Sequence, residues 1–128
     1  MSAIEHPFMG KVFVGSATKV GTLKEKYAAI LMADEAVEME FKGARDGMIF
    51  TSKRIVVINS QGITGRKIEL SSFPWKSIAA YSVENAGATD IDAELKICGS
   101  GWGVCEVQFT RGTNVAVVCQ AINQKILA

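Results

Sequence analysis

The sequence of 128 residues predicts one mainly β domain: a seven-stranded, partly open barrel or orthogonal sandwich, capped by a C-terminal helix and carrying an extra N-terminal helix. Apolar and polar residues alternate with a period of two through most of residues 36–110, as in strands with one face in water. Before and after this region, apolar residues recur every three or four positions, which is typical of amphipathic helices. Residues 16–128 are therefore expected to form a single domain. Residues 1–15 are expected to form an N-terminal segment that becomes ordered only in an oligomer.

The N-terminal helix is expected over residues 17–32. Its apolar residues share one helical face, and the lysines and glutamate between them are left for solvent. These apolar residues are Val20, Leu23, Tyr27, Ile30 and Leu31. Ser16 or Thr18 is placed to cap the first turn.

The strands follow over residues 36–110. In the first strand Val37, Met39 and Phe41 alternate with Glu38, Glu40 and Lys42, which predicts that the charged residues occupy a wet face. Two short apolar runs, 48–50 and 55–58, are separated by 51–54 and predict a hairpin. The last two alternating strands are joined by the glycine-rich loop 99–103.

The C-terminal helix is expected over residues 114–127. Val115, Val118, Cys119, Ile122 and Ile126 form one apolar stripe, and Thr113 or Asn114 is placed as the N-cap. A helix with one such stripe is well suited to close the open end of a barrel.

Composition argues against most catalytic chemistry. A single histidine, His6, excludes sites that need two imidazoles, and a net charge of +1 gives no general reason to expect nucleic acid or an anionic membrane as a partner. Three cysteines are an odd number, which does not suit a disulfide framework within one chain. No stretch resembles a signal peptide, so the cytoplasm is the expected location. We expect no enzyme activity, no cofactor and no metal.

Four segments share an order that is specific to one family. They are 45–54 (RDGMIFTSKR), 61–67 (QGITGRK), 72–78 (SFPWKSI) and 84–96 (ENAGATDIDAELK). Together they resemble the conserved blocks of the bacterial pleckstrin-homology (PH) family, the small stand-alone bacterial PH-like proteins. The resemblance implies a PH barrel with an added N-terminal helix, ring-like homo-oligomers, and no established catalytic residue or ligand.

Three regions supply candidate contacts: the first hairpin, the loop 99–103 and the N-terminal segment. Lys42, Arg45 and Lys53 lie around the first hairpin and are the candidate cradle for a lipid headgroup. The carboxylates of Asp90, Asp92 and Glu94 alternate along one strand, but the pattern lacks the glycine of a calcium loop, so alternation itself explains it.

Trp102 stands at a glycine-flanked loop tip, where it either tucks back or contacts a partner. Hydrophobic residues make up 48% of the chain and its 12 glycines add about 9%. This high apolar content favours a subunit interface, for which Phe8, Val12, Phe13 and Val14 are the candidates. We therefore expect a non-enzymatic scaffold or protein-docking module that assembles with itself. A lipid-headgroup or membrane-surface binder is the alternative, and a small-molecule binder or enzyme is a third, weaker hypothesis.

Overall fold

The computed structural model describes residues 10–64, 66–85 and 91–128. One coiled sheet contains all of the described strands, and two helices and two 3-10 turns accompany it. The strands are β1 (Gly10–Thr18), β2 (Val37–Lys42), β3 (Gly47–Thr51), β4 (Arg54–Gln61), β5 (Lys67–Pro74), β6 (Ile78–Asn85), β7 (Ile91–Gly99) and β8 (Gly103–Thr110). The helices are α1 (Lys24–Tyr27) and α2 (Val115–Ile126), and the 3-10 turns are η1 (Ala28–Ile30) and η2 (Trp75–Ser77).

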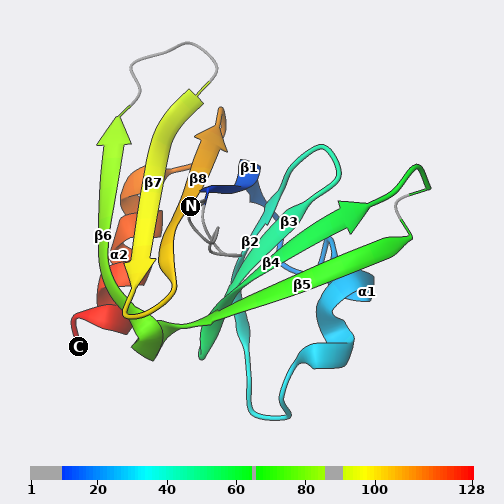
Figure 1. Ribbon diagram of the computed structural model, residues 1–128, viewed down its shortest axis with the longest axis horizontal. Coiled ribbons are helices and arrows are strands. Elements are labelled where there is room, and N and C mark those ends of the chain that lie inside the picture. The colour runs from blue at the N-terminus through cyan, green and yellow to red at the C-terminus, as the bar shows by residue number, and fades with distance from the viewer. Residues whose placement is uncertain (1–9, 65, 86–90) are drawn as a thin grey trace, which may run out of the picture.

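The eight strands lie in the order β5-β4-β3-β2-β1-β8-β7-β6. β1 links the two halves of the sheet: Ser16–Thr18 pair antiparallel with β2, and the earlier residues pair parallel with β8. β5 and β6 follow each other in the chain yet form opposite edges of the sheet and do not pair with each other. The barrel is therefore partly open rather than closed (Figure 1). The predicted mainly β, partly open fold with a C-terminal helix is confirmed.

Aromatic and aliphatic side chains from both halves of the sheet meet in one core. Phe41 contacts Phe50 and Phe109, with ring centroids 5.1 and 5.3 Å apart. α2 lies across β6–β8 and buries Val118 and Ile122 against this core (Figure 1). The helix thus closes one side of the barrel as predicted, and burial of its apolar stripe stabilises the fold.

Asn114 begins α2 as one of the two predicted caps. Its side chain accepts a hydrogen bond from Val117 N at 3.3 Å. The hairpins at 51–54 and 99–103 also form where the sequence predicts them.

The N-terminal helix predicted over residues 17–32 is wrong in extent. Residues up to Thr18 belong to β1, so the sheet has eight strands rather than seven, and only α1 and η1 are helical. Gly21 has a φ of +101°, a left-handed conformation that a continuous helix does not contain. A short helical segment is therefore present near the N-terminus, and a loop precedes it.

Candidate functional site

A buried carboxylate fastens the loop before α1 to the sheet. Glu40 in β2 is only 1% exposed and accepts hydrogen bonds from Gly21 N (2.8 Å), Leu23 N (2.6 Å) and Tyr27 Oη (2.6 Å). Burial, followed by the hydrogen bond and the charge of Glu40, raises the pKa of Tyr27 to about 12. The alternation of apolar and charged residues over 37–42 predicts that Glu40 faces solvent. That prediction is wrong because residues 19–31 cover this face of the sheet.

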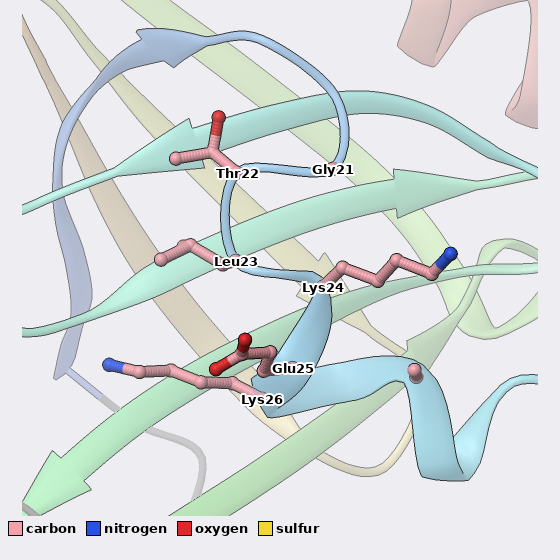
Figure 2. Close-up of a pocket in the computed structure, with 7 residues that line it drawn as sticks. Gly21, Thr22, Leu23, Lys24, Glu25 and Lys26 are labelled. Atoms are coloured by element: carbon pink, nitrogen blue, oxygen red, sulfur yellow. The ribbon is translucent and has the colours of Figure 1, made fainter.

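A surface cavity of about 580 Å³ lies along the same loop and α1 (Figure 2). In Figure 2 the side chains of Lys24 and Lys26 extend in opposite directions, and Thr22 points away from both. Both oxygens of the nearby Glu40 already accept hydrogen bonds from the protein. The arrangement therefore holds a loop in place, and neither oxygen of Glu40 is left for a ligand.

A second buried carboxylate, Glu35, also accepts hydrogen bonds from the protein through both of its oxygens. It accepts hydrogen bonds from Arg54 Nε and Nη2, both at 2.9 Å, and from Thr51 Oγ1 at 2.5 Å. These bonds, led by those from Arg54, lower the pKa of Glu35 to about 2 against the opposing effect of burial. Arg54 also donates to Ile30 O at 2.7 Å, so the cluster joins the segment after α1 to the β3–β4 turn. Its role is structural.

The cysteines and acidic residues offer little chemistry. Burial raises the pKa of Cys105 to about 11, so this residue stays a thiol. Asp90 and the side chain of Asp92 lie outside the described residues. A hydrogen bond with Glu106 raises the pKa of Glu94 above its usual value. Among the residues that the structure describes, no group of three His, Cys, Asp or Glu side chains is placed to hold a metal ion.

The structure does not bring the three predicted headgroup contacts together. Lys42 and Arg45 lie at one end of the β2–β3 hairpin, and Arg45 donates a hydrogen bond to Gly62 O in the next hairpin. Lys53 lies beyond the other end of β3, whose five residues span roughly 16 Å. There it forms an ion pair with Asp34 at 3.3 Å.

Trp102 is tucked back onto its own chain. Its ring lies 5.0 Å from that of Phe73, and its indole N–H donates to Ser77 O at 3.2 Å. The side chain remains only half-buried, so one part of it still faces solvent.

The predicted interface residues near the N-terminus divide into two kinds. Phe13 is 2% exposed and belongs to the core of its own chain, so it is not available to a partner. Val14 is 40% exposed, on the opposite face of β1. Phe8 and the side chain of Val12 lie outside the described residues.

The described sheet has two edge strands, β5 and β6, which the sequence alone did not identify. In the described part of the chain, β5 pairs only with β4, and β6 pairs only with β7. β5 carries the charged side chains of Lys67 and Glu69 and ends at Pro74, features that discourage further strand pairing. The first six residues of β6, 78–83 (IAAYSV), contain neither a charge nor a proline.

A coiled, partly open sheet closed by a C-terminal helix defines a PH-like domain. Residues 8–126 match the bacterial PH domain family, and the chain belongs to that family. The predicted family resemblance is therefore confirmed.

Relatives and solved structures agree with this assignment. The Bacillus subtilis (strain 168) protein YjqA is 48% identical over 119 residues, which cover 90% of this chain and 91% of YjqA. YozO from the same organism is 28% identical over 103 residues, covering 80% of this chain and 88% of YozO. The crystal structure of a PH-domain protein from Shewanella loihica PV-4 has a TM-score of 0.78 at 31% identity, over 88% of this chain and 97% of that one. A PH domain from Shewanella amazonensis SB2B has a TM-score of 0.70 at 37% identity, over 88% and 92%.

The described helices do not reach the length and apolar character that a bilayer-spanning helix requires.

Proposed function

We propose that the protein is a non-enzymatic bacterial PH-like module that associates with itself in the cytoplasm and thereby presents a docking surface to another protein. The observation that carries the proposal is the uncharged edge of β6. An edge strand exposes a row of unpaired backbone N–H and C=O groups, to which a further strand can add. β6 has eight residues, and its first six place no charged side chain on this edge.

The other side of β6 is already fixed, which favours the edge itself as the contact. Every described pairing of β6 is with β7, from Ile78↔Gly99 to Asn85↔Ala93. Tyr81 Oη donates to Asn123 Oδ1 in α2, which anchors the inner face of the strand. A rigid edge is preorganised for strand addition, because little conformational entropy remains to be lost on binding.

The second edge, β5, supplies a different surface. If β6 of one copy meets β5 of the next, the contact is heterologous, and repetition of it closes a ring when the rotation between copies permits. Such an assembly multiplies weak contacts to a further partner through effective concentration.

Size-exclusion chromatography with light scattering tests self-association directly. We expect an oligomer at micromolar concentration, and a monomer there would contradict the proposal. The variant Ala80→Lys places a charge at an exposed position of β6 and is expected to shift the protein towards the monomer.

Ala44→Lys is the matched control, because Ala44 is also exposed but lies in the β2–β3 turn. It is expected to leave the assembly unchanged. If both variants lower the mass equally, net charge rather than the β6 edge controls association.

A further inference from the structure

A cationic pocket lies at the corner between β5 and β6. It encloses about 540 Å³, within the range of small-molecule sites. Four separate segments line it: the β3–β4 turn, η2 with the end of β5, the last turn of α2, and the chain after η1. In Figure 1 the β5–β6 corner lies close to the C-terminal end of α2, and α2 contacts η2.

Four of the eight lining residues are cationic, and none is acidic. The lining consists of Met32, Ser52, Lys53, Arg54, Pro74, Trp75, Lys76 and Lys125. Three of these cations form ion pairs with carboxylates that are not part of the lining. In the described part of the chain, Lys76 has no such ion pair.

The strength of each ion pair decides which cations are available. Arg54 is held by Glu35, whose side chain has no exposed surface, and therefore serves as a fixed wall. Lys53 pairs with Asp34 at 3.3 Å, where the two side chains are 39% and 71% exposed. Exposed pairs of this kind contribute little, so Lys53 can turn to an incoming anion at small cost. Lys125 is held by both oxygens of Glu38, at 2.9 and 3.1 Å. Lys53 and Lys76 are thus the two ammonium groups that a ligand recruits most readily.

Local charge also limits the ligand. Four cations face three carboxylates, Asp34, Glu35 and Glu38, which leaves a net charge of +1 around the pocket. This balance matches a single negative charge better than a polyphosphate. Ser52 Oγ accepts a hydrogen bond from Ala36 N at 3.1 Å and, as a hydroxyl, also has a proton to donate to an anion.

The remaining wall is apolar. Met32 is 56% exposed although it lines a cavity, and Pro74 is exposed beside it. The indole N–H of Trp75 donates to Thr51 O at 2.7 Å, so Trp75 offers the pocket only carbon surface. An apolar ligand body that covers these side chains removes their surface from water.

We propose that this pocket binds an organic monocarboxylate whose acid group meets Lys53 and Lys76 and whose apolar body covers Met32 and Pro74. The same chemistry occurs in a free acid and at a polypeptide chain end with an apolar last residue. Binding does not depend on the β6 edge, and the pocket exists within one copy.

The test is a titration followed by backbone amide chemical shifts, with N-acetylphenylalanine as the probe. We expect saturable shifts at Ser52 and Lys76 with a Kd of about 1 mM, the order that a ligand of this size reaches. N-acetylphenylalaninamide, which lacks the charge, and acetate, which lacks the apolar body, are each expected to bind at least about fivefold more weakly. Equal binding of the neutral amide would overturn the proposal, as would shifts confined to other parts of the protein.

Matched variants locate the contact. Lys76→Gln is expected to weaken binding about fivefold, and raising the salt concentration to weaken it further, since the charge is partly exposed. Lys24→Gln removes another exposed lysine, which lines the cavity of Figure 2, and is expected to change nothing. Equal effects of the two variants would refute the assignment.

Two further measurements separate the sources and the two proposals. A short peptide ending in phenylalanine that binds more tightly than the free acid, and loses this advantage when its C-terminus is amidated, identifies a chain end as the source. Weaker binding of the peptide identifies a small acid. Repeating the titration on Ala80→Lys shows whether the pocket binds when association is impaired, so failure of one proposal is distinguishable from failure of the other.

Discussion

Replacing Glu40 by glutamine tests whether the buried carboxylate holds the N-terminal loop. The carboxylate accepts from Gly21 N and Tyr27 Oη through one oxygen and from Leu23 N through the other. A glutamine amide has one oxygen and one NH₂ group. Either orientation of the amide therefore turns a donor towards one of the two backbone N–H groups, and that N–H loses its acceptor.

The magnitude follows from the hydrogen bonds lost. Losing a buried hydrogen bond to a charged acceptor, or leaving its donor unpaired, costs about 1.5–3 kcal/mol. The bonds that remain also weaken, because the amide is neutral, while its easier burial recovers part of the total. We expect Glu40→Gln to lower the free energy of unfolding by about 2–3 kcal/mol. With a urea m-value of about 1.5 kcal/mol per M, the unfolding midpoint falls by roughly 1–2 M.

Urea unfolding followed by circular dichroism measures the change, and amide hydrogen exchange locates it. Faster exchange is expected at Gly21 and Leu23. Glu25→Gln is the control, since Glu25 is exposed on the same segment, and it is expected to stay within about 0.5 kcal/mol of the wild type. A wild-type midpoint for Glu40→Gln would refute the reasoning.

Tyr27 adds a check at alkaline pH. Its pKa is raised from 10.0 to about 12 in the folded protein, so its contribution is fully present below pH 10 and is lost as the pH rises towards 12. The stability advantage of the wild type over Tyr27→Phe is therefore expected to shrink across this window. A constant difference between pH 9 and 12 would contradict the assigned hydrogen bond.

Three further predictions concern other parts of the fold. The pKa of Glu35 is lowered from 4.5 to about 2 beside Arg54, so its stabilisation is present above pH 4.5 and is lost as the pH falls towards 2; acid titration of unfolding should show a loss of about 3 kcal/mol that Glu35→Gln lacks. Ile122→Ala removes a side chain with no exposed surface and should cost about 3 kcal/mol in urea unfolding, whereas a cost below about 1 kcal/mol would show that α2 does not close the core. In Gly99→Ala the added Cβ lies 1.9 Å from atoms of the Trp102 ring, so the indole must swing out; tryptophan fluorescence should shift to the red, and an unchanged spectrum would contradict the tucked position.

The periodicity of apolar residues predicts well those elements that bury one side against a single core. The helix expected over 114–127 is α2, Val115–Ile126, because its apolar stripe has a single core to cover. The β7–β8 hairpin was equally predictable, since Leu95 and Val107 alternate with polar residues and face the same interior.

The N-terminal third was less predictable because distant contacts decide it. β1 pairs with β8, which lies at the far end of the sequence, and no local pattern carries that information. Glu40 alternates like a surface residue, yet the loop at Gly21 covers it. Gly21 itself was a usable signal against one continuous helix, since glycine is unfavourable in a helix interior.

The position of β1 also has a consequence for how the protein is made. Ala17 N donates to Thr113 Oγ1 at 2.8 Å across 96 positions of sequence, and the first part of β1 pairs only with β8. At about 5–20 residues per second, a ribosome needs roughly 5–20 s to synthesise the stretch between these two residues. The hairpins of β2–β5 can form while the nascent chain is still growing, whereas its first strand must wait for nearly the last residues to emerge.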